Sequence, residues 1–362
     1  MKVSPFITSK TNTQAVMLDV IIALVPLAAV AIYAFGTRAI TVLGYSLLSC
    51  VITDLLFGYL FLNKRKWLPD GAAVITALLL AFTLSPLTPW YLVVFGGISA
   101  ILFGKILWGG LGKNRFNPAL VGREFMTAFF PAIMSDGVLW NTKLFVENTN
   151  TSIRTLTDNP QLRELLTTFI YNPLGALGEY SLLALALGGI YLLLRSRISW
   201  HIPVVFIFSL MLMQNILPIE GSANFSLGGL LLGAIFMATD MPTSPTQAKA
   251  KIYFGAMLGV VVAVMLSSGI NNVYLSYGIL LMNAFSAQIN SLFMPTAWGH
   301  KPDRGFIKWE TIAKQTLIIL LACFAIISLH KANLIHYLIY LFALYTILKF
   351  YYHHQFKTNE LF

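Results

Sequence analysis

A short polar segment interrupts one of the long apolar stretches of the sequence and carries side chains that can bind a ligand. It reads FMATDMPTSPTQAK from residue 236 to residue 249, and Thr239, Asp240, Thr243 and Ser244 supply three hydroxyl groups and one carboxylate. Oxygens of these kinds bind hard cations, and they can also bind the polar edge of a planar cofactor ring. The alternative interpretation of Asp240 is an acid that ends a helix and is solvated at a membrane face.

Two further carboxylates, Asp19 and Asp54, lie inside apolar stretches, where an ionisable group is costly and usually faces a cavity or a partner. Either one is a candidate cation or proton site on an ion path. The alternative for Asp19 is a position near the inner membrane interface, where it would have little effect. Lys105 also lies in an apolar stretch, and we expect its long side chain to reach the membrane surface rather than to take part in chemistry.

A helix is expected to begin at the sequence NPAL, with Asn117 as its N-cap and Pro118 in its first turn. Arg123 and Glu124 follow in that helix. Because adjacent residues point in different directions on a helix, these two charges need different partners. The guanidinium group of Arg123 is a candidate partner for a phosphate.

Other common functional patterns are absent from the sequence. Cys50 and Cys323 are the only cysteines, and since each lies in an apolar run they indicate neither a disulfide framework nor a metal site. The six histidines show no metal-ligand spacing, and there is no Walker loop, dinucleotide-binding glycine motif, nucleophile elbow or Cys-x-x-Cys pair.

The composition indicates an integral membrane protein. Of 362 residues, 57% are hydrophobic and only 10% are charged, whereas soluble domains carry about a quarter charged residues. The net charge of +10 comes from bases scattered in short loops, which favours a topological role over nucleic-acid binding. The polar N-terminus has no small-residue cleavage site after its first apolar run, so no removable signal peptide is expected.

Apolar runs of about 20 residues are long enough to cross a bilayer as helices. Two shorter runs, 71–85 and 225–239, end in polar segments with proline and are expected to be half-helices or core segments. With them the sequence predicts twelve crossings. The ten longer candidates are 15–36, 39–62, 88–110, 118–135, 180–195, 200–217, 251–270, 273–293, 313–330 and 333–352.

The basic residues predict that both termini lie in the cytoplasm and that the long polar loop at residues 136–175 lies outside. With that orientation, lysines and arginines are concentrated in the inner loops, as the positive-inside rule requires. The inner set is Lys64, Arg65, Lys66, Lys113, Arg115, Arg195, Arg197, Lys249, Lys251, Lys301, Arg304 and Lys308, and the outer set is Arg38, Lys143, Arg154, Arg163 and Lys331.

An internal repeat is suggested by two Ser-Pro pairs, because Ser85 precedes Phe95 and Ser244 precedes Phe254 by the same interval, each Phe being followed by Gly. Five crossings precede the outer loop and five follow it, which predicts two inverted five-helix units with broken helices at matching positions. Such breaks must face protein or a cavity rather than lipid. The expected fold is therefore all-α and polytopic, with repeats at 1–135 and 176–299 and two extra C-terminal membrane helices at 300–362.

Several motifs together resemble one family. They are KNRFNPALVGREF (113–125), NPLGALGEYSLLALALGGIYLL (172–193), ISWHIP (198–203), GGLLLGAIFMATDMPTSP (228–245) and ILLMNAF (279–285). They resemble the D subunit of the Rnf ion-translocating ferredoxin:NAD oxidoreductase, which is similar to the B subunit of the sodium-pumping NADH:quinone reductase. The likeness runs from about residue 4 to about residue 300.

This resemblance implies a subunit of a multi-subunit oxidoreductase in the bacterial inner membrane, which couples electron transfer to Na⁺ or H⁺ movement. It implies FMN joined through its phosphate to a threonine of the outer loop, and a second, non-covalent flavin between the helices. A flavin transferase and an outer flavoprotein subunit are implied as partners, and the NAD and iron–sulfur chemistry is expected in other subunits. Thr239, Asp240, Thr243 and Ser244 would then border a flavin or an ion path.

The outer loop departs from the family pattern of Ser/Thr-Gly-Ala-Thr. The nearest match is SIRTL, which places Thr155 at the attachment position and Ser152 three residues before it. Ile153 and Arg154 replace the small pair and would crowd the approach of a transferase, although Arg154 could pair with the phosphate. The alternative is an ordinary solvated loop rich in serine and threonine. In that case the chain is an inverted-repeat transporter or channel, or a membrane scaffold, that has lost the covalent flavin.

Overall fold

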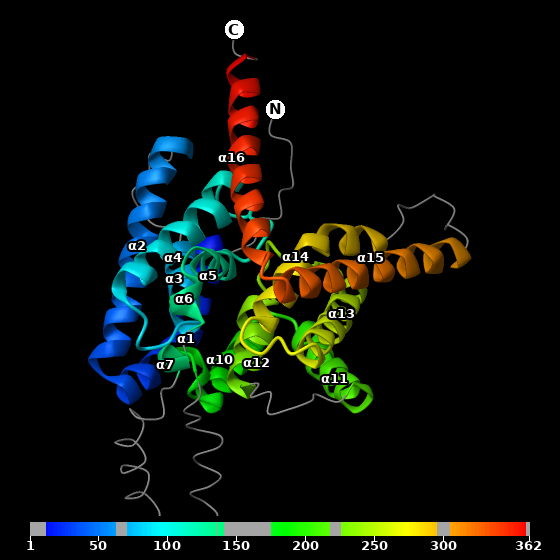
Figure 1. Ribbon diagram of the computed structural model, residues 1–362, viewed down its shortest axis with the longest axis horizontal. Coiled ribbons are helices and arrows are strands. Elements are labelled where there is room, and N and C mark those ends of the chain that lie inside the picture. Colours follow the sequence, from blue (N-terminus) through cyan, green and yellow to red (C-terminus); the bar gives the residue numbers. More distant parts are fainter. Residues whose placement is uncertain are drawn as a thin grey trace, which may run out of the picture.

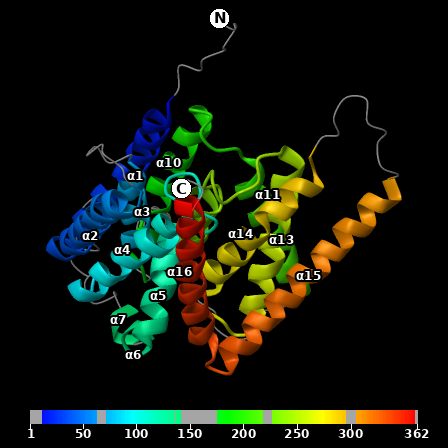
Figure 2. The same ribbon diagram turned by 90° about the horizontal axis from the view of Figure 1, so that it is seen from above.

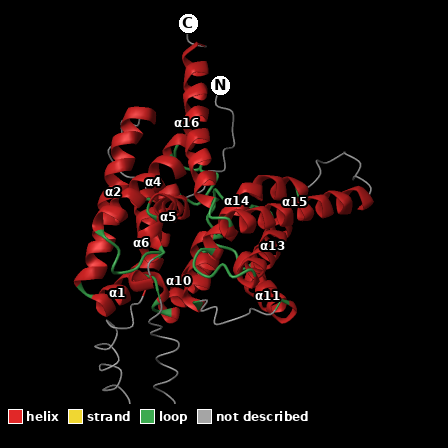
Figure 3. Cartoon of the chain, viewed as in Figure 1, coloured by secondary structure: helices red, strands yellow, loops and turns green. Residues whose placement is uncertain are grey.

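The computed structural model describes residues 12–62, 71–135, 137–140, 175–217, 226–294 and 305–359. Every regular element in these ranges is helical, which confirms the expected all-α class (Figure 3). The helices form two groups that lie side by side, one from the N-terminal part of the chain and one from the middle (Figure 1).

The first group precedes the segment 141–174, and the second group follows it. The first contains α1 (Thr13–Phe35), α2 (Thr37–Leu62), α3 (Ala72–Phe82), α4 (Trp90–Gly104), η1 (Ile106–Trp108), α5 (Pro118–Phe129), α6 (Pro131–Met134) and α7 (Gly137–Trp140). The second contains η2 (Leu177–Glu179), α10 (Leu182–Leu194), α11 (His201–Ile216), α12 (Leu227–Leu232), η3 (Gly233–Met237), α13 (Ala248–Ser267) and α14 (Tyr274–Leu292). The chain ends with α15 (Gly305–Lys331) and α16 (Ile335–Asn359).

Six of the described helical segments are long and apolar enough to cross a membrane: α1, α2, α4 with η1, α13, and parts of α15 and α16. The chain is therefore a multi-pass membrane protein. The expectation of an unbroken span over 118–135 is wrong, because α5 ends at Phe129. Phe130 precedes Pro131, and a residue before proline avoids helical dihedral angles. A 12-residue helix covers only about 18 Å, less than the bilayer core of about 30 Å.

The two shorter apolar runs, expected to be half-helices or core segments, form short helices that end inside the protein. The first, α3, has 11 residues. The second is α12 continued by η3, a π-helical turn in which the Ala238 N–H donates to the Gly233 carbonyl oxygen at 2.7 Å. Turns of this kind often mark functional sites, since they widen the helix and displace its side chains.

Glycine allows close approach both between the two groups and within the first. A Cβ atom on Gly188 of α10 would lie 2.5 Å from the carbonyl oxygen of Ala23 in α1. In the first group, Gly97 of α4 faces Ser49 of α2, and a Cβ atom on Gly97 would collide with the serine hydroxyl oxygen. Small residues at such contacts are typical of membrane helices, whose association depends on close van der Waals packing.

The C-terminal helices connect the two groups. Helix α15 packs on α13 and α14, and the Tyr253 hydroxyl lies 2.7 Å from that of Thr316. The next helix, α16, turns back to α5 and η1, where the Tyr340 hydroxyl donates to the Ala128 carbonyl oxygen at 3.1 Å. Figure 2 shows α16 lying between the first group and α14.

Candidate functional site

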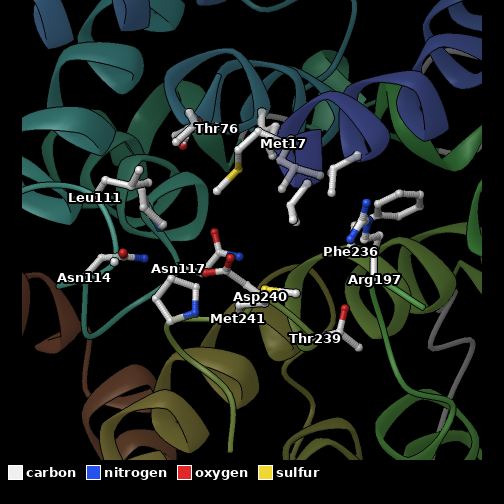
Figure 4. Close-up of a pocket in the computed structure, with 18 of the residues that line it drawn as sticks. Met17, Thr76, Leu111, Asn114, Asn117, Arg197, Phe236, Thr239, Asp240 and Met241 are labelled. Atoms are coloured by element: carbon white, nitrogen blue, oxygen red, sulfur yellow. Dashed lines mark hydrogen bonds between the residues drawn. The ribbon is translucent and has the colours of Figure 1, made fainter. Parts of the chain in front are cut away.

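A cavity of about 270 Å³ lies between the two helix groups (Figure 4). Its walls come from α1, α3, the start of α5, the end of α10 and the polar segment after η3. Most of the wall is apolar, with Met17, Leu79 and Phe236 among its side chains. Its polar wall residues are Thr13, Thr76, Lys105, Asn114, Asn117, Arg197, Thr239 and Asp240.

Asp240 is a half-buried wall residue of this cavity. Its Oδ2 accepts a hydrogen bond from the Thr243 hydroxyl at 3.2 Å, and its carbonyl oxygen accepts from the N–H groups of Thr243 and Ser244 at 3.2 and 3.0 Å. Burial raises the pKa of Asp240 to about 6, while the Thr243 hydroxyl opposes that rise. Since the carboxyl can gain or lose a proton near neutral pH, it can bind either a proton or a cation.

Asn117 attaches the first helix group to the polar segment of the second. Its Oδ1 accepts from the N–H groups of Ala119 and Leu120, as expected for an N-cap, and its Nδ2 donates to the Met237 carbonyl oxygen at 3.3 Å. Figure 4 shows Asn117 and Asp240 extending towards the same part of the cavity from different elements. An amide and a carboxyl group thus line the same cavity at the junction of the two groups.

Asn283 of α14 joins this polar junction. With its amide oriented to satisfy its neighbours, its oxygen accepts from the Asn117 N–H at 3.1 Å and its nitrogen donates to the Thr243 carbonyl oxygen at 3.2 Å. The sequence interpretation missed Asn283 as a site residue, although an asparagine within the apolar run ILLMNAF was a usable signal. It also treated Asn117 only as a helix cap.

The other predicted residues of this segment have different positions. Thr239 is buried on the cavity wall and its hydroxyl donates to the Ile235 carbonyl oxygen. Thr243 is 0% exposed and reaches the cavity only through Asp240. Ser244 is half-buried and does not line the cavity.

Asp19 is buried in an ion-pair cluster between α1 and the end of α10. Its Oδ2 lies 2.6 Å from Arg197 Nε, and its Oδ1 lies 3.3 Å from Arg195 Nη2 and 3.1 Å from the Tyr191 hydroxyl. Arg197 also lines the cavity, a role that the sequence interpretation missed. A cation would have to displace an arginine to bind Asp19.

Asp54 and Lys105 form a buried ion pair between α2 and the end of α4. Lys105 Nζ lies 3.1 and 3.2 Å from the two carboxylate oxygens, and Lys105 is only 2% exposed. The expectation that Lys105 reaches the membrane surface is therefore wrong. Its side chain points inward because a buried carboxylate, which would be strongly destabilising alone, supplies a partner of opposite charge.

Arg123 and Glu124 have different partners, as expected from their adjacent positions. Arg123 Nη2 donates to the Asn272 carbonyl oxygen at 3.0 Å, and its guanidinium lies 5.9 Å from the ring centre of Trp140. Buried Glu124 accepts a hydrogen bond from the Ser276 hydroxyl.

The candidate attachment residues Ser152 and Thr155 lie outside the described residues. Trp140, which Arg123 contacts, is the last described residue before the segment that contains them. Within the described part of the chain, no group of three His, Cys, Asp or Glu side chains could hold a metal ion.

The cavity has the properties that a planar ring system requires. Its apolar side chains can cover the two faces of a ring, while Asn117 and Asp240 can hydrogen-bond to a polar edge. Its volume is slightly below the roughly 300–1,000 Å³ usual for ligand pockets, so it suits a ring system better than a complete dinucleotide.

Comparison with known proteins gives a consistent result. A family model described as the NQR2, RnfD, RnfE family matches residues 1–299. The D subunit of the Na⁺-translocating ferredoxin:NAD⁺ oxidoreductase complex of Acetobacterium woodii is 34% identical over 299 residues, covering 82% of this chain and 94% of that protein. The D subunit of the proton-translocating complex of Clostridium ljungdahlii is 32% identical, covering 82% and 95%. The D subunit of the ion-translocating oxidoreductase complex of Pectobacterium carotovorum is 29% identical, covering 82% and 98%.

Proposed function

The chain belongs to the NQR2, RnfD, RnfE family, and from this membership we propose that it is the membrane electron-transfer subunit of an ion-translocating ferredoxin:NAD⁺ oxidoreductase complex. The relatives are named as D subunits of such complexes, and they support a role within an assembly rather than as a stand-alone enzyme. The observation that carries the redox part of the proposal is the cavity between the helix groups, with its apolar walls and its Asn117–Asp240 edge.

We propose that this cavity holds the ring of a non-covalent flavin. Met17 and Phe236 would cover the ring, and Asn117, Thr239 and Asp240 would hydrogen-bond to its edge. The flavin would supply one- and two-electron transfer, and the protein would set its position and exclude water. Protonation of Asp240 would change the charge beside the ring and so link its redox state to proton or cation uptake.

A covalent FMN at Thr155 is the second part of the proposal, with Ser152 beside the attachment point. The position of Arg123 supports it. The guanidinium lies over the ring of Trp140, and Trp140 is the described residue before the loop that is nearest in sequence to Thr155. Arg123 would then neutralise phosphate charge. An outer flavoprotein subunit would exchange electrons with this flavin, and a flavin transferase would install it.

The ion path is proposed to include Asp240, with Asp19 and Asp54 as further candidates. Asp19 and Asp54 already pair with arginine and lysine, so each would take part only by exchanging that partner for the moving ion. Asp240 has no such cation among the described residues and is the strongest of the three. The complexes of A. woodii and C. ljungdahlii are named for different ions, Na⁺ in one and protons in the other, and either fits a carboxylate.

Two inverted five-helix units, with both termini on the cytoplasmic side of a bacterial inner membrane, complete the proposal. In support, α1–α5 precede the segment 141–174 and α10–α14 follow it, and α3 and α12–η3 each lead into a Ser-Pro turn and then a long helix. Broken helices at corresponding positions of two halves are expected in transport folds built from inverted repeats.

Flavin fluorescence in a denaturing gel tests the covalent site. The wild type, co-expressed with a flavin transferase, should give a fluorescent band that disappears in Thr155→Ala and persists in the matched control Thr151→Ala. A dark wild-type band would contradict covalent attachment. Flavin released by denaturing folded Thr155→Ala tests the cavity separately, and its absence would favour the alternative of a transporter or scaffold with the same fold.

A further inference from the structure

A second cavity, of about 310 Å³, lies between the family-matched part of the chain and the C-terminal helices. One wall comes from the region of α5 and from α14, and the other from α15 and α16, which follow the end of the family match at residue 299. Val121, Leu280, Ala284, Leu338 and Phe342 are among its lining residues. The surface exposed to the cavity is apolar, although Glu124 and Tyr277 also belong to the lining. An apolar cavity of this size within a membrane protein suits a hydrocarbon chain.

Three cations gather around an aromatic cluster at one end of this cavity. Phe116 and Phe342 line the cavity and pack on Trp108, with ring centres 6.0 and 6.4 Å from the Trp108 ring. Lys349 Nζ lies 3.9 Å above the Trp108 ring, and Arg115 Nη2 donates to the carbonyl oxygen of the lining residue Ala284 at 2.9 Å. The third cation, Lys113, packs against Gly109 beside the same tryptophan.

The three cations are exposed, and in the described part of the chain none of them forms a salt bridge with a carboxylate. Lys113 and Arg115 also belong to the loop that the basic-residue pattern assigns to the cytoplasmic side. Basic pockets between membrane helices on that side bind the head groups of anionic lipids, and aromatic rings at the same level are typical of the membrane interface.

We propose that this cavity binds an anionic phospholipid, with an acyl chain between α5, α14 and α16 and its phosphate at Lys113, Arg115 and Lys349. A single molecule would thereby bridge the family-matched helices and the C-terminal helices. The lipid combines the two features that the site presents, an apolar tail and a negative head group. A free phosphate would use only the cations, and a neutral lipid only the cavity.

Native mass spectrometry of the full-length protein tests the proposal, with phosphatidylglycerol and phosphatidylcholine of identical acyl chains in competition. The wild type should retain phosphatidylglycerol preferentially. The double variant Arg115→Gln/Lys349→Gln should lower that preference about 25-fold, at about fivefold for each removed charge. Ala284→Trp should abolish retention by filling the cavity, and the matched control Lys314→Gln, near the start of α15 and away from the lining residues, should leave it unchanged.

Three results would overturn the proposal: equal retention of the two lipids by the wild type, an unchanged preference in both site variants, or displacement of the lipid by inorganic phosphate alone. If the variants do not fold, the wild type still decides the question. Its midpoint of thermal unfolding should be higher in nanodiscs of phosphatidylglycerol than in nanodiscs of phosphatidylcholine, and equal midpoints would contradict a bound anionic lipid.

Discussion

Thr83, Ser85 and Thr88, in the helix break after α3, are all buried, and each donates its hydroxyl hydrogen to a main-chain carbonyl oxygen. The break after η3 has a comparable set of hydroxyls and a Ser-Pro pair, but it also carries Asp240 and borders the cavity. The first break makes its hydrogen bonds within its own helix group and to η2, whose Leu177 N–H donates to the Leu84 carbonyl oxygen at 2.9 Å. The second is held by Asn117 and Asn283.

The comparison shows which features of a Ser-Pro break serve the structure and which can serve chemistry. The backbone groups freed at a helix break within a membrane protein must be satisfied internally, and hydroxyl side chains are one kind of group that can do this. Only the second break adds a titratable group and asparagines from other helices. The Ser-Pro repeat therefore locates two breaks, while the carboxylate and its amide neighbours identify the one that borders a site.

The largest effect is expected from Asn117→Leu, which removes the side chain that joins α5 to the second break. It deletes the N-cap, which typically contributes about 1 kcal/mol, and leaves the Met237 carbonyl oxygen unpaired, at about 1–3 kcal/mol. We therefore expect a loss of about 2–4 kcal/mol of unfolding free energy, measured by thermal unfolding in detergent. Asn114→Leu is the control, because it changes another buried asparagine of the same cavity. Equal losses of unfolding free energy in the two variants would mean that Asn117 has no special role in stabilising the second break.

Asp240→Asn tests the effect of the carboxylate charge separately from the packing of the side chain. The substitution keeps the size of the side chain and its capacity to accept from Thr243, but removes the charge. In the assembled complex we expect at least a tenfold loss of ion transport coupled to NADH formation, equivalent to about 1.4 kcal/mol. The rate of ion transport is measured in proteoliposomes. The control Ser85→Ala, at the first break, should transport ions at a rate within about twofold of the wild type. If Asp240→Asn transports ions at the wild-type rate, the second break has no chemical role that the first break lacks.

The parts of the fold that were predictable are those determined by neighbours along the chain. Apolar runs located most helices, and the NPAL sequence correctly placed the cap of α5 at Asn117. The contacts that define the site depend on residues far apart in sequence. Asn117 meets Met237, and Lys105 meets Asp54, and no local pattern predicts that a buried cation finds a carboxylate on another helix. The break at Phe130 was locally encoded by Pro131, but the apolar composition around it concealed the break.

Ser85→Ala should have a moderate effect on stability and little effect on activity. The Ser85 hydroxyl donates to the Leu139 carbonyl oxygen and accepts from the Leu87 N–H at 3.2 Å, so its removal leaves buried polar groups without partners. We expect a loss of about 1–2 kcal/mol of unfolding free energy. Ser135→Ala is the matched control, since exposed Ser135 donates only to the Pro131 carbonyl oxygen, and it should change stability by less than about 0.5 kcal/mol. A loss in Ser135→Ala as large as that in Ser85→Ala would mean that the Ser85 hydrogen bonds do not stabilise the first break.

The smallest expected effect is a shift in pH dependence caused by Thr243→Val. Burial raises the pKa of Asp240 from an ordinary value of 3.8 to about 6, and the hydroxyl of Thr243 lowers it by donating to the carboxylate. Removing that donor should raise the pKa further. If the ionised form carries the coupled reaction, activity falls as pH falls through about 6 in the wild type, and the fall should begin at higher pH in Thr243→Val.

The stability of the folded protein should depend on pH in the opposite sense. Because the folded-state pKa of Asp240 is raised, the folded form binds this proton more tightly than the unfolded form, so the contribution of Asp240 to stability increases as pH falls through about 6 towards 4. Proteoliposome rates and unfolding midpoints measured over the same pH range would therefore change in opposite directions for a single carboxyl group. Thr88→Val, which removes a buried hydroxyl from the first break, should shift neither profile along the pH axis. A shift in Thr88→Val as large as that in Thr243→Val would show that the pH dependence does not arise from the second break.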